Sequence, residues 1–242
     1  MHMRIGKINT VLLTLTVALQ GVLLYQIYTA RPRAPEPVRN APDDVTVDVT
    51  SMPSMGSKSA NAFVVEFSDY ECPFCRRHAT GVLKELRRQY VDTGKVRYVF
   101  ANNPLKMHQS ARLLARGAIC AGQQEQYWDL HDRLFESESK TADDITRLID
   151  DMSLERSAFH KCMGDEVGAT KVIDADVKLA TGLGLLSTPS FAVGTVDGGG
   201  RARLQKLIVG AQPLEVFQSV IDDMLDDRVT EKGLWGWLQK WL

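Results

Sequence analysis

The chain has 242 residues, of which 29 are basic and 30 acidic, and 44% are hydrophobic. A charge balance so close to neutral supplies no field that would recruit nucleic acid, so we expect no nucleic-acid partner. The apolar content is sufficient for a globular core, and four cysteines are too few for a disulfide scaffold in a chain of this length.

The first 30 residues form an apolar segment with basic residues ahead of it. Arg4 and Lys7 precede Ile8–Tyr28, which has no charged side chain. A helix of about 20 such residues spans the hydrocarbon of a bilayer. We predict an uncleaved signal anchor over residues 1–30; a cleaved signal peptide is the alternative, although its exit at Tyr28-Thr29-Ala30 fits poorly. Long domains translocate largely regardless of charge, so the rest of the chain is expected in a bacterial periplasm, held to the inner membrane by this single pass.

Residues 31–60 differ in composition from both of their neighbours. They hold five of the nine prolines, which are Pro32, Pro35, Pro37, Pro42 and Pro53. Proline-rich segments of this kind act as extended spacers rather than packed elements. We therefore expect a linker that holds a domain away from the membrane.

A strand–helix–strand unit comes next. Ala62–Phe67 is a short run of aromatic and β-branched residues, typical of a buried strand. Apolar residues at helical spacing follow, and Pro73 fits the first turn of that helix. Lys95–Ala101 has the pattern of a second strand. The pair Cys72 and Cys75 is thereby predicted at the N-terminus of a helix.

Two cysteines at a helix N-terminus favour redox chemistry. The free N–H groups and the helix dipole stabilise a thiolate on Cys72. Cys75, one turn further on and on the apolar face, is within disulfide reach. A zinc site would need a second ligand pair at similar spacing, which the single Cys120 and Cys162 do not supply. A purely structural disulfide between residues so close together would constrain little of the unfolded chain.

The remainder of the domain divides into a helical part and a late group of strands. Helical periodicity runs almost throughout residues 108–183. Strand patterns return only at Ser190–Val193 and Leu204–Val209, and Pro213 opens a final helix.

The segment VVEFSDYECPFC, which ends at Cys75, resembles the active-site segment of the DsbA-like branch of the thioredoxin superfamily. Downstream, Ser187–Phe191 reads STPSF and is similar to the turn in which family members carry a cis-proline. The resemblance covers about residues 60–225. It implies a thioredoxin-like α/β fold over residues 61–228, with the helical stretch 105–183 as an insertion and the N-terminal transmembrane helix ahead of it.

The resemblance also implies roles for the residues of the Cys-Pro-Phe-Cys segment. Cys72 would be the nucleophile and Cys75 the resolving cysteine. Pro73 and Phe74, which lie between the two cysteines, would contact substrate. The best-known oxidase of the family has histidine where this chain has Phe74. Phenylalanine supplies neither a hydrogen bond nor a positive charge to the thiolate, which argues against strong oxidising power.

Three further positions match the family's pattern. Pro189 would be the cis-proline that faces the cysteine pair, and Thr188 before it would contact substrate. Glu66 aligns with an acid that family members bury beneath the redox pair. Burial would raise its pKa and let it exchange a proton with Cys75. The alternative for Glu66 is an exposed position on the strand.

Two features lie away from this site. Cys120 and Cys162 fall in the helical insertion, where a structural disulfide would close a loop of about 40 residues and stabilise the fold by about 4 kcal/mol. Two buried free thiols, or a second redox pair, are the alternatives. The tryptophan-rich residues 229–242 would lie in the membrane interface or pack on the domain or a partner subunit.

Together these features predict a membrane-tethered periplasmic thiol–disulfide oxidoreductase that forms or exchanges disulfides in extracytoplasmic proteins. The reductase or isomerase direction of the same chemistry is one alternative, and a non-enzymatic tethered binding or chaperone module is another. An oxidase would need a membrane reoxidant of the DsbB type, and a reductase an electron donor across the membrane. No cofactor and no metal ion are expected.

Overall fold

The computed structural model describes residues 15–24, 37–43, 45–138, 140–150, 152–196 and 201–238. It separates into two units, 1–36 and 37–242. In the first unit, residues 15–24 form an exposed helix, and the other residues of the predicted span Ile8–Tyr28 lie outside the described part. Across the ranges given above, no helix is both long enough and apolar enough to cross a membrane.

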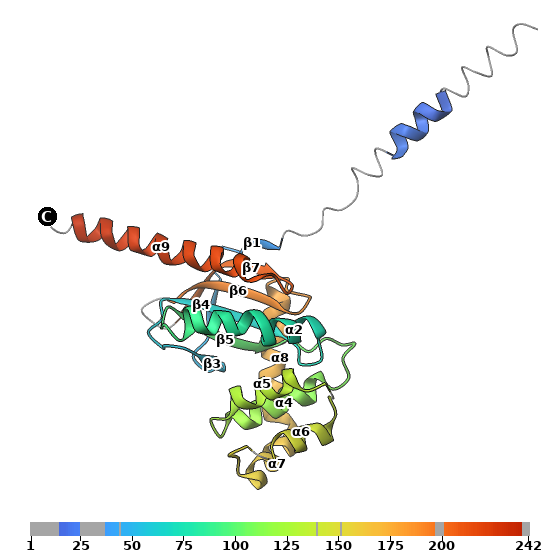
Figure 1. Ribbon diagram of the computed structural model, residues 1–242, viewed down its shortest axis with the longest axis vertical. Helices are drawn as coiled ribbons and strands as arrows, with labels where there is room; N and C mark the ends of the chain where they lie inside the picture. The colour runs from blue at the N-terminus through green and yellow to red at the C-terminus, as the bar shows by residue number, and fades with distance from the viewer. Residues whose placement is uncertain are drawn as a thin grey trace, which may run out of the picture. The chain divides into compact units, whose positions relative to one another are not determined.

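The second unit is built on a mixed β-sheet (Figure 1). Its strands follow the order β1-β7-β6-β4-β5-β3, with β2 also paired to β7. Only β4 and β5 run parallel among these pairs; the others are antiparallel. The strands within the described residues are β1 (Val38–Asn40), β2 (Thr46–Asp48), β3 (Ser54–Met55), β4 (Ala62–Ser68), β5 (Val96–Asn102), β6 (Ser190–Val196) and β7 (Arg201–Val209).

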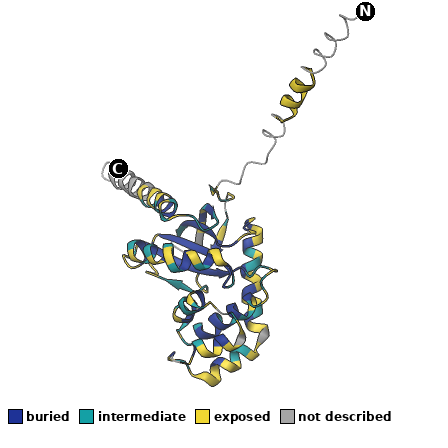
Figure 2. Ribbon diagram, turned by 45° about the vertical axis from the view of Figure 1, so that its right-hand side comes forward, coloured by how far each residue is buried: buried dark blue, intermediate teal, exposed yellow. Residues whose placement is uncertain are grey.

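The parallel strands β4 and β5 lie inside the sheet, between β6 and β3. Every residue of β4 and β5 is buried, as expected for strands covered from both sides (Figure 2). Parallel neighbours need a crossover connection, which the helical stretch from Pro73 to Val91 provides. That stretch consists of α2 (Pro73–Arg77), a π-helical segment (His78–Val82), α3 (Leu83–Leu86) and a second π-helical segment (Arg87–Val91).

Alternate residues of the strands supply two apolar layers, one on each face of the sheet. On one face Val64 and Tyr98 belong to the cluster that holds Cys75, Leu83 and Phe217. On the other face the packing partners come from the end of α8 and the turn after it; this cluster includes Phe63, Val65, Phe67, Val99, Ala180 and Leu183.

Between β5 and β6 the chain forms the helical insertion that the sequence predicted. Its helices are α4 (Ala111–Gly122), α5 (Tyr127–Glu136), α6 (Ala142–Leu148), α7 (Arg156–Gly164) and α8 (Glu166–Gly182). In Figure 1, α4 to α7 gather at one end of the molecule, and α8 leads from them back to the sheet. Cys120 of α4 and Cys162 of α7 are joined by a disulfide, the pairing that the sequence analysis expected.

The structure corrects the predicted linker over residues 31–60. From Val38 onward this segment adds strands to the sheet: β1 and β2 pair with β7, and β3 pairs with β5. The edges of β7 and β5 offer unpaired backbone groups, and these short strands satisfy them. Pro37, Pro42 and Pro53 lie beside the strands rather than inside them, where proline is tolerated. The folded domain therefore starts at about residue 37, ahead of the predicted start at 61.

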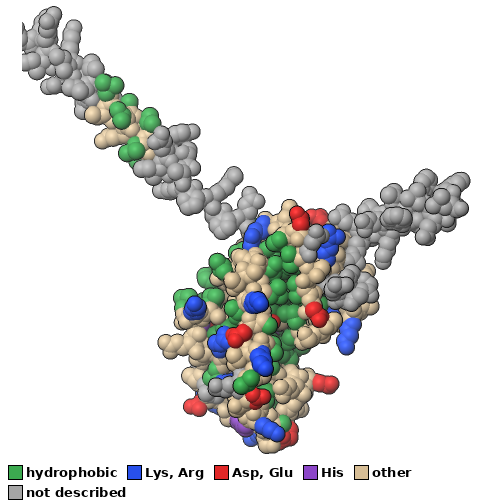
Figure 3. All heavy atoms as spheres, turned by 180° about the vertical axis from the view of Figure 1, so that it is seen from behind, with side chains coloured by type: hydrophobic (Ala, Val, Ile, Leu, Met, Phe, Trp, Pro, Cys, Tyr) green, Lys and Arg blue, Asp and Glu red, His purple; other side chains and the backbone are tan. Residues whose placement is uncertain are grey.

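The C-terminal helix is also longer than predicted. α9 (Leu214–Leu238) continues past residue 228, where the sequence analysis began a separate tail. The remaining tail residues 239–242, and the side chains of the last part of α9, lie outside the described part. Elsewhere on the domain, the face in Figure 3 carries basic and acidic side chains interspersed, with no large area of one sign.

Candidate active site

The cysteine pair lies where β4 passes into α2. Cys72 is the N-cap residue, with an extended backbone, and its N–H donates to the Asp69 carbonyl oxygen at 3.1 Å. Cys75 lies within the first turns of the helix and belongs to the apolar cluster on that face. Both are buried free thiols. The sequence prediction for the place of this pair is therefore correct.

The two thiols have opposite proton affinities. A hydrogen bond from the Cys75 thiol is the main reason that the pKa of Cys72 falls to about 5, against the opposing effect of burial. Backbone N–H groups of Phe74 and Cys75, exposed at the helix start, also lower it. Burial raises the pKa of Cys75 well above its usual value, and its role as donor to Cys72 raises it further. Cys72 thus suits a nucleophile and leaving group, and Cys75 a protonated resolving thiol.

The turn before β6 faces Cys72. The peptide bond between Thr188 and Pro189 is cis, as the resemblance implied. The Cys72 thiol donates to the Thr188 carbonyl oxygen at 3.3 Å. The buried Thr188 hydroxyl has no hydrogen-bond partner in the described part of the chain, and as a donor group beside Cys72 it lowers the pKa of that thiol. The Thr188–Pro189 turn therefore lies directly against the Cys72 sulfur.

Glu66 is buried, which was the favoured expectation. It points from β4 to the face that carries Val64 and Cys75, and its side chain has no exposed surface. Burial raises the pKa of Glu66 to about 7, although the Tyr98 hydroxyl, which donates to Oε2 at 2.6 Å, partly offsets the rise. Ser68, on the same face of β4, lowers the pKa of both Glu66 and Cys75. A carboxyl with this proton affinity can take up and release a proton near neutral pH.

Asp69 anchors the rim of the site. Its carboxylate accepts hydrogen bonds from the N–H of Glu71 at 2.8 Å, from the N–H of Leu105 at 2.7 Å and from His108 Nδ1 at 2.8 Å. These bonds fix the loop after β5 against the segment before Cys72. Burial disfavours the charged form of His108, but the bond to Asp69 outweighs it and raises the pKa of His108.

Apolar side chains are exposed in the segments that adjoin the thiols. Phe74 is 54% exposed, and the Arg77 guanidinium lies 5.2 Å from the centre of its ring. Pro73 is also exposed. Leu186, just before the cis-proline turn, and Met107, on the loop that Asp69 fixes, are 73% and 78% exposed. Large apolar side chains exposed at such positions are suited to contact with a polypeptide.

Sequence reasoning missed Tyr98, Ser68 and Asp69. Tyr98 was one apolar residue among several in a predicted strand, and only the register that pairs it with Val64 places its hydroxyl toward Glu66. Ser68 lies two residues beyond Glu66, so the period of a strand already put both on one face. Asp69 carried no signal, because its partners Leu105 and His108 come from a distant loop.

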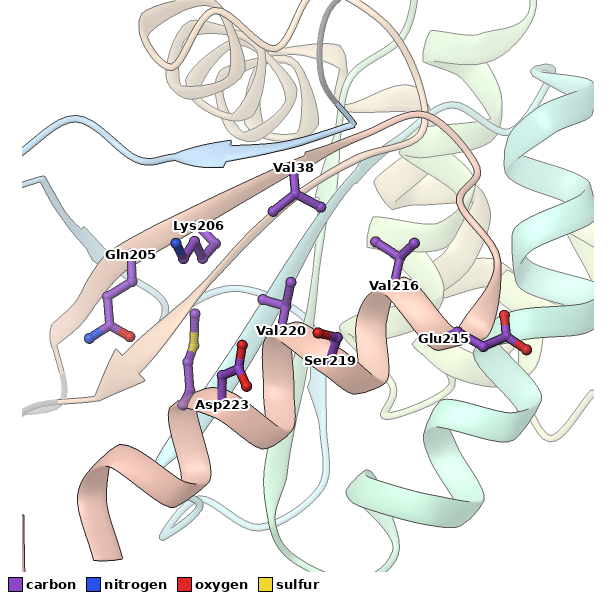
Figure 4. A pocket seen from close by; sticks show the side chains of 9 residues that line it. Val38, Gln205, Lys206, Glu215, Val216, Ser219, Val220 and Asp223 are labelled. Carbon is purple, nitrogen blue, oxygen red and sulfur yellow. The ribbon is translucent and has the colours of Figure 1, made fainter. Parts of the chain in front are cut away.

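We also looked for a metal-binding cluster and for a cavity next to the cysteine pair. Among the residues described, no group of three or more His, Cys, Asp or Glu is arranged to hold a metal ion. A cavity of about 630 Å³ lies between β1, β7 and α9 (Figure 4), lined by Val38, Gln205, Lys206, Glu215, Val216, Ser219, Val220, Asp223 and Met224. It contains neither cysteine of the pair, so it is separate from the thiol site.

The arrangement defines a class of protein. A dithiol at the start of the crossover helix, opposite a cis-proline turn and above a buried acid, is the site of a thioredoxin-fold protein. The chain belongs to the thioredoxin family: the family model described as "Thioredoxin" matches residues 48–222.

The chain is also similar to parts of individual curated proteins. The chain is 36% identical over 92 residues to a probable disulfide bond formation protein D of Bacillus anthracis, covering 38% of this chain and 42% of the relative. It is 33% identical over 141 residues to a Na(+)/H(+) antiporter NhaA 3 of Salinispora tropica, covering 57% of this chain but only 21% of that protein. The chain thus spans less than half the length of these curated relatives.

A solved structure shares the fold. The Wolbachia pipientis alpha-DsbA1 structure superimposes with a TM-score of 0.63 at 22% identity, covering 75% of this chain and 94% of that one. At this identity the similarity concerns the fold alone.

Proposed function

We propose that the chain is a DsbA-like thiol–disulfide oxidoreductase that exchanges disulfides with extracytoplasmic proteins. The observation that carries the proposal is the contrast between a Cys72 thiol whose pKa lies near 5 and a Cys75 thiol whose pKa lies well above its usual value. A structural thiol pair has no need of this contrast, whereas disulfide exchange requires one thiolate and one protected partner. The name of the Bacillus anthracis relative, a probable disulfide bond formation protein, supports the same activity.

The exchange proceeds in two displacements. A substrate thiolate attacks the sulfur of Cys72 in the oxidised pair, the Cys72–Cys75 bond breaks, and Cys75 leaves with the electron pair and takes up a proton. A second thiolate of the substrate then attacks the substrate sulfur that is bonded to Cys72 in the mixed disulfide. The bond between the two breaks, and Cys72 leaves as a thiolate. The substrate gains a disulfide and the enzyme is left as the dithiol.

Oxidation of the substrate is the favoured direction. The reduced form holds the Cys72 thiolate with hydrogen bonds from Cys75, Thr188 and the backbone, and stabilising the reduced form makes the disulfide a better oxidant. These donors lower the pKa of Cys72 without the histidine that Phe74 replaces. A catalytic cycle in this direction needs a membrane partner that reoxidises the pair.

Turnover by two single variants tests the activity. In an assay that follows disulfide formation in a reduced client protein, Cys72→Ser abolishes turnover. Cys75→Ser has no Cys72–Cys75 disulfide to donate, so it also fails to oxidise the reduced client. Offered a client that already holds a disulfide, its Cys72 thiolate attacks that bond, one client thiolate leaves, and the mixed disulfide persists because no Cys75 thiol is present to resolve it. The control is Ser219→Ala, in the cavity beside α9, which keeps full turnover. Retention of turnover by Cys72→Ser would exclude the proposed function and favour a binding module.

We further propose that residues 1–30 tether the domain to the bacterial inner membrane, with the domain in the periplasm. The uncharged run Ile8–Tyr28 and the separation of residues 1–36 from the folded unit support this. After extraction of membranes with alkaline carbonate, the full chain stays with the membranes and a chain starting at residue 37 is released. Release of both forms would contradict the tether.

A further inference from the structure

Three buried polar side chains form a continuous hydrogen-bonded chain beneath the cysteine pair. The Tyr98 hydroxyl donates to Glu66 Oε2 at 2.6 Å, and His78 Nε2 lies 3.1 Å from the same hydroxyl oxygen. Glu66 comes from β4, Tyr98 from β5, and His78 lies one turn after Cys75 on the crossover helix. All three side chains have no exposed surface.

The direction of each proton follows from the groups present. A carboxylate only accepts, so the single proton of the Tyr98 hydroxyl goes to Glu66. The Tyr98 oxygen must then accept from His78, whose Nε2 carries the hydrogen. His78 Nδ1 has no partner within the described part of the chain. The chain therefore runs in one sense, from His78 through Tyr98 to Glu66.

His78 acts in this chain as a neutral donor. Its ring packs against Phe191 and Phe217, with centroid separations of 4.6 and 5.3 Å. Burial among these rings lowers the pKa of His78 to about 3, so the side chain carries no charge at neutral pH. His78 therefore contributes a hydrogen bond from Nε2–H to the Tyr98 oxygen, and neither a transferable proton nor a positive charge.

The chain leaves one oxygen of Glu66 without a hydrogen bond. Oε1 is buried and makes no hydrogen bond among the residues described, and the Ser68 hydroxyl, which lowers the pKa of Glu66 from the same face of β4, makes none either. Because Tyr98 occupies Oε2, a proton bound by Glu66 resides on Oε1. Burying a carboxyl oxygen without a hydrogen-bond partner destabilises the fold. Proton exchange with the nearby thiols would explain why this arrangement is kept.

We propose that Tyr98 and His78 are positioning residues that hold Glu66 with Oε1 free, so that Glu66 exchanges one proton with Cys75 during disulfide exchange. The proposal rests on the proposed function. When the Cys72–Cys75 bond breaks, its electron pair stays on Cys75, and the proton on Glu66 Oε1 moves to the Cys75 sulfur. Glu66 becomes a carboxylate that Tyr98 already solvates. Reoxidation of the pair returns the same proton to Glu66.

Other groups around Glu66 do not replace Tyr98. Arg87 is held by both oxygens of Asp132 at 2.7 and 2.8 Å, which offsets its field. Tyr70, like Tyr98, has its pKa raised well above the usual value and stays protonated. The titratable and charged groups that interact with Glu66 from the surrounding elements are Cys72, Cys75, Arg87, Tyr70, Tyr98 and Tyr127.

The test is a titration of Glu66 itself, followed by the chemical shift of its ¹³C-labelled carboxyl group in the reduced protein without substrate. In the wild type the midpoint is expected near pH 7. Tyr98→Phe removes only the donor hydroxyl, so the carboxylate is less stable and its proton affinity rises about tenfold. His78→Phe shifts the midpoint in the same direction but less. His78→Gln, which keeps an N–H donor, restores it. Tyr90→Phe is the matched control: the Tyr90 hydroxyl donates to Asp222 rather than to Glu66, so its removal leaves the Glu66 midpoint unchanged.

A second readout links the chain to catalysis. The pH profile of mixed-disulfide formation by the oxidised enzyme moves to higher pH in Tyr98→Phe, and this shift disappears when Glu66→Gln is also present. An unshifted Glu66 midpoint in Tyr98→Phe, or a profile shift that persists with Glu66→Gln, would overturn the proposal. The carboxyl titration needs no turnover, so its result is independent of whether Cys72→Ser abolishes activity.

Discussion

At the scale of single residues, the site depends on the unequal surroundings of two chemically identical thiols. Cys72 lies at the helix N-terminus, where N–H groups have no partner within the helix, and Cys75 lies one turn deeper among apolar side chains. The hydrogen bond between them reinforces the difference, since it stabilises the thiolate on one and retains the proton on the other.

The first prediction concerns that hydrogen bond. Thiolate absorbance at 240 nm in the reduced protein should show a transition with a midpoint near pH 5. Cys75→Ala removes the main donor, and we expect the midpoint to rise by about one pH unit or more. The transition should be absent in Cys72→Ser. An unchanged midpoint in Cys75→Ala would mean that the backbone donors alone stabilise the thiolate.

The second prediction concerns Glu66 and stability. Its pKa is about 7 in the folded protein against 4.5 ordinarily, so the folded state binds the proton more tightly. The resulting stability is fully present below about pH 4.5 and is lost as the pH rises to 7. Glu66→Gln removes this dependence. Its free energy of unfolding relative to wild type should therefore increase by about 3 kcal/mol between pH 4.5 and 7.5.

The measurement is urea unfolding of the reduced proteins across this pH range. Glu85→Gln is the control: Glu85 is solvent-exposed on the crossover helix and bonded to Arg88, which lowers its pKa, so its replacement should not reproduce the gain. A difference between Glu66→Gln and wild type that stays constant with pH would contradict the prediction.

At the scale of elements, the helical insertion is held together by a disulfide as well as by packing. Cys120 of α4 and Cys162 of α7 are 42 residues apart in sequence. A crosslink over a loop of this length reduces the entropy of the unfolded chain by an amount worth about 4 kcal/mol. The crosslink lies in the helical insertion, away from the segment that carries the redox pair.

The third prediction separates these two disulfide systems. A Cys120→Ser, Cys162→Ser double variant should lose about 2 to 5 kcal/mol of unfolding free energy. The midpoint of the Cys72 thiolate titration should stay at its wild-type value. Thermal unfolding, compared with that of the wild type under non-reducing conditions, measures the first effect. A displaced thiolate midpoint would show that the insertion and the redox site are coupled.

At the scale of the whole molecule, the balance between dithiol and disulfide decides the direction of electron flow. Thioredoxin, with a nucleophile pKa of about 7, has a potential near −270 mV, and DsbA, with a pKa of about 3.5, has one near −120 mV. Cys72, with a pKa of about 5, lies between them.

The fourth prediction is therefore a potential between about −270 and −120 mV for the Cys72–Cys75 pair. It is measured by equilibrating the folded domain, residues 37–242, with glutathione buffers and trapping the free thiols. Thr188→Val removes one donor to the thiolate and should lower the potential toward that of thioredoxin. A wild-type value at or below −270 mV would reverse the proposed direction of catalysis.

Much of the site was predictable because its residues are close in sequence or belong to a recognisable motif. The period of the strand and the helix placed Cys72 and Cys75 at a helix start without any tertiary information, and the Thr188–Pro189 motif indicated the opposing turn. Residues 38–55 were misassigned as linker because short edge strands have little pattern of their own. They are strands only because β7 and β5 offer them partners.

The sequence by itself indicated the place of the cysteine pair, the crossover helix and the helical insertion, because local periodicity and helix-end chemistry depend on neighbouring residues. Tertiary structure alone decided what surrounds the thiols. The register of β4 against β5 brings the Tyr98 hydroxyl to Glu66, and His78 of the crossover helix hydrogen-bonds to that hydroxyl. Asp69 finds its partners 36 and 39 residues away. Proton affinities in a buried site depend on such distant groups, and no local pattern encodes them.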